Sequence, residues 1–130
     1  MKAVRLLLTI TALVLAGYLY AADNMPQGVT TQKTASGMMI LADAKGMTLY
    51  TFDKDMNGMS MCNGQCAAAW PPLKAAGDAM TMGDWTVVTR NDGSKQWAYK
   101  GKPLYTYAKD AKPGETTGDG VGNNWHMAMP

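Results

Sequence analysis

Closely spaced methionines are the feature of this sequence best suited to chemistry. Eleven of its twelve methionines follow residue 22, and several stand outside the segments that are expected to form strands. Thioether sulfur is a soft ligand that, together with imidazole, suits Cu(I) where thiols are oxidised. The pattern therefore raises the hypothesis of a Cu(I) or other soft-metal site. The candidate ligands are Met56, Met59, Met61, His126, Met127 and Met129.

Methionine also fills irregular gaps in protein cores, which is the alternative explanation for its abundance. We expect Met38, Met39 and Met47 to serve in this way, because they lie within or beside predicted strands. For the methionines in polar, glycine-rich loops, both explanations stay open at this stage.

The two cysteines, Cys62 and Cys66, are separated by three residues. This spacing matches neither the C-x-x-C motif of thioredoxin-like proteins nor the C-x-x-C-H motif of covalent haem attachment. In an exported chain a disulfide is the default, and closing so short a loop contributes about 2 kcal/mol. We expect this disulfide to fix a local turn; thiolate metal binding and thiol redox exchange are the alternatives.

Other catalytic or metal-binding constellations are weak in this sequence. His126 is the only histidine, and no nucleophile-elbow pattern accompanies it. Asp53, Asp55 and Asn57 begin like an EF-hand calcium loop, but Gly64 stands where the bidentate glutamate is required. The sequence thus favours no enzyme, and it suggests no cofactor other than the hypothetical Cu(I).

The first residues have the order of a secretory signal peptide. Lys2 and Arg5 flank an apolar run of 14 residues, which is shorter than the roughly 20 residues of a membrane-spanning helix. Small residues then end at Ala22, so we expect a signal peptide at 1–22 and one domain at 23–130, located in the periplasm or secreted. An uncleaved anchor is the alternative, because Tyr20 is bulky for its place before the cleavage site.

Removal of the signal peptide changes the charge of the chain. Two basic residues and no acidic ones are lost, so the formal net charge falls from +2 to zero. A neutral surface lacks the electrostatic attraction that holds nucleic acid or an anionic membrane. We expect no nucleic-acid partner and no membrane span after cleavage. The partner would be an unidentified envelope ligand or protein, and the sequence leaves the oligomeric state open.

The sequence contains two copies of one unit, offset by 55 residues. Gly46–Asp55 and Gly101–Asp110 share six of ten positions, and each copy continues through a loop to a tryptophan, Trp70 or Trp125. Self-similarity of this kind predicts that the units pack on each other, since a single small sheet cannot bury its apolar face alone. The copies extend over about 29–73 and 87–130.

Turn residues and β-branched residues divide each copy into three strands. Asn91–Gly93 is a strong hairpin signal, and a run of alanines before Pro71 favours one helical turn. We therefore expect a mainly β fold: a small single domain of two pseudo-repeated three-stranded β-meanders with one short helix. The predicted strands are 30–32, 38–41, 48–52, 86–89, 95–99 and 104–107, the predicted helix is 65–69, and 114–124 is expected to be a loop.

One motif of aromatic and acidic residues stands in both copies. In a strand, its tyrosine and the aromatic residue two positions later share a face, and its aspartate falls at the strand end. The structural interpretation is that the aromatics pack in the core and the aspartate caps a turn. The functional interpretation is that both sets form a single ligand site. The motif residues are Tyr50, Phe52, Asp55, Tyr105, Tyr107 and Asp110.

In these residues the sequence resembles a bacterial family of secreted repeats, often lipoproteins, that is defined by a Y-x-[FWY]-x-x-D motif. The family's C-x-x-x-C-A and W-P-P-L segments match Cys62–Ala67 and Trp70–Leu73. Its R-x-D-G segment matches Arg90–Gly93, and its G-x-G-V-G segment with the following tryptophan matches Gly118–Trp125. The lipid-bearing cysteine common in the family is missing here. The family has no established activity, so the resemblance implies a secreted repeat domain and little about function.

The leading functional interpretation is an exported envelope protein that acts as a non-enzymatic binding or structural module. A periplasmic Cu(I)-binding protein is the second interpretation, and a redox role of the cysteine pair is the third. The copies differ in the loops that follow the two motifs: the first loop carries the cysteines, and the second is rich in glycine and is followed by His126. A specific activity would lie in these unequal loops.

Overall fold

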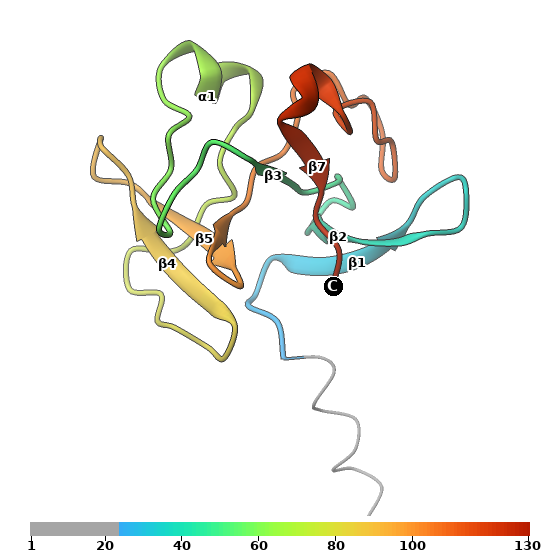
Figure 1. Ribbon diagram of the computed structural model, residues 1–130. Coiled ribbons are helices and arrows are strands. Elements are labelled where there is room, and N and C mark those ends of the chain that lie inside the picture. The colour runs from blue at the N-terminus through green and yellow to red at the C-terminus, as the bar shows by residue number, and fades with distance from the viewer. Residues whose placement is uncertain (1–23) are drawn as a thin grey trace, which may run out of the picture.

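The computed structural model describes residues 24–130, and the expected signal peptide at 1–22 lies outside them. Seven short strands, one α-helix and one 3-10 turn make up the fold of this part of the chain (Figure 1). The expected mainly β fold with one short helix is thereby confirmed. In chain order the elements are β1 (Val29–Lys33), β2 (Met39–Asp43), β3 (Tyr50–Phe52), α1 (Gln65–Ala69), β4 (Trp85–Thr89), β5 (Lys95–Tyr99), β6 (Lys102–Pro103), η3 (Val121–Asn123) and β7 (Trp125–Met127).

Three elements differ from the expectation, and one of them, strand β7, was not among the predicted strands. The third strand of the second copy was expected at 104–107, but the strand in this region, β6, covers Lys102–Pro103. It begins directly after a tight turn in which Lys100 and Gly101 both have positive φ. The stretch 114–124, expected as a loop, contains the 3-10 turn η3. Strand β5 and helix α1 have the predicted bounds.

The strands form three antiparallel sheets, β1–β2, β3–β7 and β4–β5–β6. The second copy has the expected three-stranded meander. In the first copy, the third strand is joined to β2 by a hydrogen bond from Leu49 N–H to Leu41 C=O, but it then pairs with β7 of the second copy. At this point Tyr50 and Tyr105 exchange two backbone hydrogen bonds of 2.8 and 3.0 Å, so each third strand turns to the other copy.

Each copy is completed by the end of the other. Ala128, which follows β7 in the second copy, donates its N–H to Leu49 C=O in the first copy at 2.8 Å. Leu73, at the end of the first copy, donates its N–H to Leu104 C=O in the second copy, also at 2.8 Å. The two copies therefore exchange their last segments, and neither contains all of its strand pairings by itself.

Two clusters of buried side chains form the core, and both take residues from both copies. Burying their apolar surface therefore requires the copies to pack together. The first cluster is aliphatic with two tryptophans and contains Leu41, Leu49, Leu73, Trp85, Trp97, Leu104 and Ala128. The second, the aromatic cluster, contains Tyr50, Cys62, Trp70, Tyr105 and Trp125.

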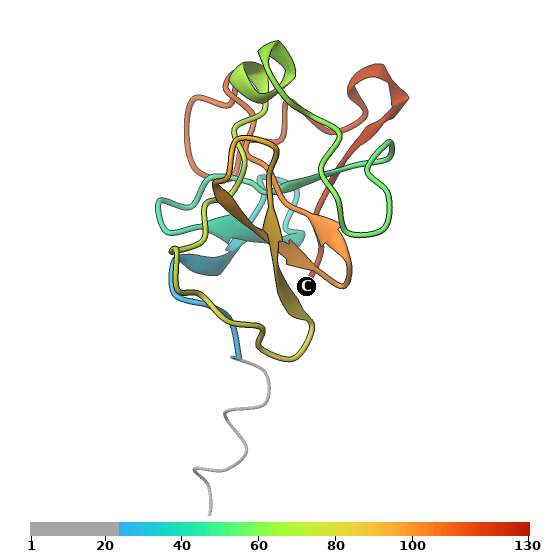
Figure 2. The same cartoon turned by 90° about the vertical axis from the view of Figure 1, so that its left-hand side faces the viewer.

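The elements that differ between the copies gather at one end of the molecule. Helix α1 and the turn η3 lie there, whereas the described segment that precedes β1 lies at the opposite end (Figures 1 and 2). No helix in residues 24–130 has the length and apolar character needed to cross a bilayer.

The expectation that Met38 and Met39 fill gaps in the core is wrong. Their side chains are 41% and 42% exposed. Met39 is the first residue of β2 and is exposed, whereas the next three residues of the strand are buried, so the core covers the middle of β2 and not its beginning. Met47 is partly buried.

We predict that Gly118→Ala destabilises the fold. A Cβ atom at Gly118 would lie 2.8 Å from the Trp70 ring, and overpacking of this kind costs about 1–3 kcal/mol. Urea unfolding of the variant measures the loss. Gly77→Ala is the matched control, because its Cβ would meet nothing within 4 Å. Equal stability of the two variants would contradict this account.

Candidate functional site

The tyrosines and aspartates of the repeated motif are hydrogen-bonded across the copies and not within them. The Tyr50 hydroxyl donates to Asp110 Oδ2 at 2.6 Å, and the Tyr105 hydroxyl donates to Asp55 Oδ2 at 2.7 Å. Both tyrosine side chains are fully buried. Each copy thus supplies the acceptor for the buried hydroxyl of the other, as pseudo-twofold symmetry requires.

Both aspartates also fix the loop that follows them. Asp55 Oδ1 accepts a hydrogen bond from Met61 N–H at 2.7 Å, and Asp110 Oδ1 accepts one from Thr117 N–H at 2.9 Å. Such backbone contacts are what the structural interpretation of the motif predicts. The mutual hydrogen bonds of these hydroxyls and carboxylates inside the protein therefore agree with the structural interpretation of the motif.

Burial changes the acid–base behaviour of these pairs. Desolvation, together with the hydrogen bond to Asp110, raises the pKa of Tyr50 far above its ordinary value. Desolvation is also the largest cause of the raised pKa of Tyr105. Burial raises the pKa of Asp55, although the hydrogen bond from Met61 N–H opposes this effect. Both tyrosines therefore remain protonated donors throughout the neutral range.

Four aromatic rings stack in a column that joins the two copies. Trp70 and Trp125 lie at its centre, with ring centroids 3.7 Å apart and ring planes 2° from parallel. Phe52 stacks on Trp125 at 4.2 Å. Tyr107 stacks on Trp70 at 3.9 Å. The second aromatic residue of each motif therefore covers one end of the column, and each stacked pair contributes about 0.5–1.5 kcal/mol beyond its buried area.

Arg90 is a buried cation that holds the cysteine loop, a role that the sequence did not reveal. Its Nη1 donates to Ser60 Oγ at 2.9 Å and to Gln96 Oε1 at 2.7 Å. Its Nη2 donates to Cys62 C=O at 2.7 Å. The R-x-D-G segment is the signal that marks this arginine, but two of the partners lie in the other copy, where no local pattern identifies them.

The expected disulfide between Cys62 and Cys66 is present, with Cα atoms 5.2 Å apart. Cys62 is fully buried in the aromatic cluster, and residues 24–130 contain no free cysteine. The bridge lies where the chain enters α1, so it fixes a local turn as predicted.

The methionine loop, Met56–Met61, carries three of the candidate metal ligands. Met56 and Met59 exchange backbone hydrogen bonds of 3.3 and 2.8 Å across a two-residue turn. The side chains of Met56, Met59 and Met61 are 60%, 59% and 54% exposed, and neither apolar cluster includes them. The structure therefore places these three methionines in one loop with their side chains exposed.

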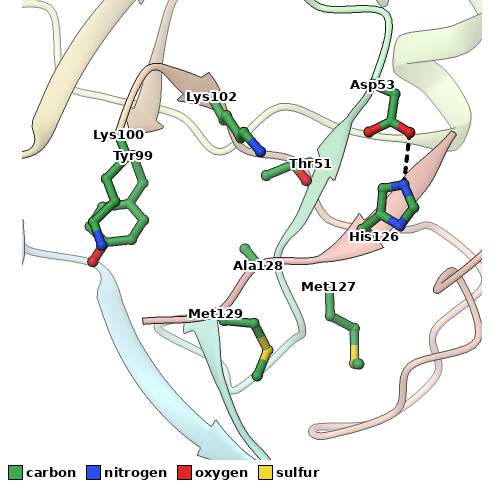
Figure 3. A pocket seen from close by; sticks show the side chains of 9 residues that line it. All are labelled: Thr51, Asp53, Tyr99, Lys100, Lys102, His126, Met127, Ala128 and Met129. Carbon is green, nitrogen blue, oxygen red and sulfur yellow. Dashed lines mark hydrogen bonds and ion pairs between the residues drawn. The ribbon is translucent and has the colours of Figure 1, made fainter.

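The three candidate ligands of the tail do not converge. His126 Nε2 lies 2.8 Å from Asp53 Oδ2 in a half-exposed pair. Met127 follows on the opposite face of β7, where it packs against the aromatic cluster. Figure 3 shows the His126 ring directed toward Asp53 and away from the sulfur atoms of Met127 and Met129. In the described part of the chain, no group of three histidine, cysteine, aspartate or glutamate side chains is placed to hold a metal ion.

A family model described as a secreted repeat of unknown function matches residues 31–74 and 86–129. The two matches cover more than half of the chain and begin 55 residues apart, which is the offset of the two copies. No curated protein and no solved structure shows a match.

The cross-copy hydrogen bonds predict a specific pattern in double-mutant cycles. Tyr50→Phe and Asp110→Ala are expected to couple by about 1.5–3 kcal/mol in the free energy of unfolding, the value of a hydrogen bond to a charged group. Tyr50→Phe with Asp55→Ala is the matched control, and its effects are expected to be additive because these side chains share no hydrogen bond. Urea unfolding measures both cycles. Equally strong coupling in the control would contradict the pairing of each tyrosine with the aspartate of the other copy.

The raised tyrosine pKa values predict a loss of stability in alkaline solution. A group whose pKa is raised on folding stabilises the protein fully below its unfolded pKa, about 10 for tyrosine, and this contribution is lost as the pH rises further. We expect the urea concentration at the midpoint of unfolding to decrease as the pH rises above about 10. Tyr50 and Tyr105 are expected to ionise only when the protein unfolds. The absorbance of tyrosinate in a pH titration measures at which pH the tyrosines ionise. Ionisation of every tyrosine near pH 10 in the folded protein is the contrary result.

Proposed function

The chain belongs to this family of secreted repeats of unknown function, and from that premise we propose that it is a non-enzymatic binding module for Cu(I). The proposed ligands are the thioethers of Met56, Met59 and Met61. The three tail candidates are left out, because the His126 ring is directed toward Asp53 and away from the sulfur atoms of Met127 and Met129. We further infer a periplasmic or secreted location, which agrees with the description of the family.

The turn at the tip of the methionine loop aligns the first two sulfur ligands. Asn57 and Gly58 have positive φ values of 53° and 71°, as in the type I′ turns of tight hairpins. Met56 and Met59 flank this turn and exchange both backbone hydrogen bonds. Their side chains therefore leave the hairpin on the same face, with Cβ atoms about 4.5–5.5 Å apart. Methionine is flexible, so two thioethers at this separation can bind one ion.

Hydrogen bonds beneath the loop direct the third methionine outward. The Ser60 hydroxyl is held on the inner side by the Tyr105 hydroxyl at 2.7 Å and by Arg90 Nη1 at 2.9 Å. Its neighbours Met59 and Met61 therefore face solvent, as their exposure indicates. The observation that carries the proposal is this set of three thioethers on the outer side of one anchored loop.

The second copy is an internal comparison for the loop. It makes the same motif contacts without methionine at the corresponding positions. Folding of the unit therefore does not require methionine there, and an exposed thioether gains little free energy from burial. Ligand binding accounts for these residues better than packing does. Ala111 and Gly114 lie 55 residues after Met56 and Met59, and Thr117 has the place of Met61, because its N–H donates to Asp110 as that of Met61 donates to Asp55.

Cu(I) is the ligand class that fits this donor set. Thioether sulfur is soft and favours Cu(I) over the harder divalent ions. With Cys62 and Cys66 joined in a disulfide, thioethers are the soft donors that stay available in an oxidising compartment. The proposal involves coordination alone and no bond to a substrate, which is why we infer a binding module and not an enzyme.

Titration with Cu(I) in the absence of oxygen tests the proposal. The purified protein competes with a chromogenic Cu(I) chelator, and the fall in chelator absorbance measures the affinity. We expect binding to weaken about tenfold or more in Met59→Leu with Met61→Leu, which corresponds to about 1.4 kcal/mol. Leucine keeps the apolar character of the side chain and removes the sulfur donor.

Met80→Leu is the matched control, because Met80 is 76% exposed and lies outside the methionine loop. It is expected to bind Cu(I) as the unchanged protein does, and circular dichroism shows whether each variant is folded. The proposal fails if the unchanged protein does not compete with the chelator, or if Met80→Leu loses as much affinity as the double variant.

A further inference from the structure

A second candidate site lies in the cavity shown in Figure 3. Its volume of about 310 Å³ is at the lower end of the range for small-molecule sites, about 300–1,000 Å³. Strand β3 provides one part of the lining, the turn between β5 and β6 a second, and β7 with the chain after it a third. Both copies therefore contribute to the cavity.

Two lysines bring positive charge to this cavity. Lys102 extends toward Thr51 (Figure 3). Lys100 lies along the Tyr99 ring, with Nζ 5.0 Å from the ring centroid. Within residues 24–130, neither ammonium group forms an ion pair with a carboxylate. Both charges are therefore available to a ligand from outside.

The carboxylate that lines the cavity, that of Asp53, is already paired with a histidine. Asp53 Oδ2 lies 2.8 Å from His126 Nε2, and Figure 3 shows the two side chains directed toward each other. Ala128 and Met129 line the cavity as well and add apolar surface. The cavity thus combines unpaired positive charge with an apolar wall.

Comparison of the two copies shows which of these charged groups the fold itself does not require. The strand pairing that forms the cavity occurs in both halves, because Tyr50 pairs with Met127 and Tyr105 pairs with Pro72. The second pairing forms without charge at three of the corresponding positions, so these three groups belong to one half alone, whereas the counterpart of Lys100 is the charged Lys45. The counterparts of Lys102, Asp53 and His126 are Met47, Ala108 and Pro71.

We propose that this cavity binds the oxyanion group, a carboxylate or a phosphate, of a small organic molecule. Lys102 and Lys100 supply the positive charge, and the Thr51 hydroxyl supplies a hydrogen-bond donor. Ala128 and Met129 form the wall against which the apolar body of the ligand lies. The neutral net charge expected for the mature chain does not oppose such binding, because attraction at contact distance dominates over distant, screened charges. The site does not depend on the proposed binding of Cu(I).

An NMR titration of the purified protein tests the site. Inorganic phosphate and acetate are added separately at constant ionic strength, with chloride as the reference salt, while the backbone amide signals of Thr51, Lys102 and His126 are followed. We expect saturable shifts with at least one oxyanion. A response to phosphate alone identifies a phosphate ligand, and a response to acetate alone identifies a carboxylate ligand. Absent or non-saturable shifts with both overturn the proposal.

Lys102→Met gives the cavity the residue that the other copy has at this position. We expect it to weaken oxyanion binding about tenfold, because one of the two ammonium groups is lost. Lys45→Met is the matched control, since Lys45 precedes Gly46 in the first copy as Lys100 precedes Gly101 in the second. An equal loss in the control would mean that net charge alone attracts the anion, and the proposed site would be abandoned.

Discussion

The reciprocal hydrogen bonds of Tyr50 with Asp110 and of Tyr105 with Asp55 determine how the two copies are arranged. A buried hydroxyl without a partner costs about 1–3 kcal/mol, so each tyrosine requires an acceptor inside the protein. Within each motif the chain turns after the second aromatic residue, where Asp55 N–H donates to Phe52 C=O and Asp110 N–H donates to Tyr107 C=O. Each aspartate then bonds its own following loop and not the tyrosine of its own motif. The other copy, turned by the pseudo-twofold axis, brings its aspartate to the hydroxyl instead. The same arrangement stacks the two central tryptophans and pairs the backbones of the two tyrosines.

This arrangement leaves the loops between motif and tryptophan free to differ. Asp55 and Asp110 each fix a backbone N–H in the loop that follows, and each loop must return to the column at Trp70 or Trp125. Between these points the first copy has a disulfide and α1, and the second has a glycine-rich path that passes directly over the Trp70 ring at Gly118. The contents of the loops are therefore not fixed by the symmetry of the fold. Residues that one copy has and the other lacks are candidates for function for this reason.

Local signals in the sequence predict the local elements of this fold. The turn at Asn91–Gly93 delimits β5, and Pro71 ends α1, so both have the predicted bounds. The hydrogen bond of Tyr50 with Asp110 joins residues 60 positions apart, and no pattern in a single sequence states which of several aspartates meets a given tyrosine. Likewise, the methionine loop was evident from spacing, but the cavity of Figure 3 was not, because three separate segments line it. The prediction for Met39 was wrong because an apolar residue at the start of a strand does not reveal whether the rest of the protein covers that end of the strand.

The methionine loop inverts the usual arrangement of a surface loop, in which polar groups face water and apolar groups face the core. Its polar contacts lie on the inner side because Arg90 is buried, and a buried cation is tolerated only when its donors are satisfied. Ser60 and Cys62 provide two of the acceptors that Arg90 requires, and this fixes the loop backbone in one conformation. The outward direction of the methionines is then a consequence of burying a charge beneath them. A ligand that binds to such a prearranged loop loses less free energy in ordering it than a ligand that must order a flexible segment.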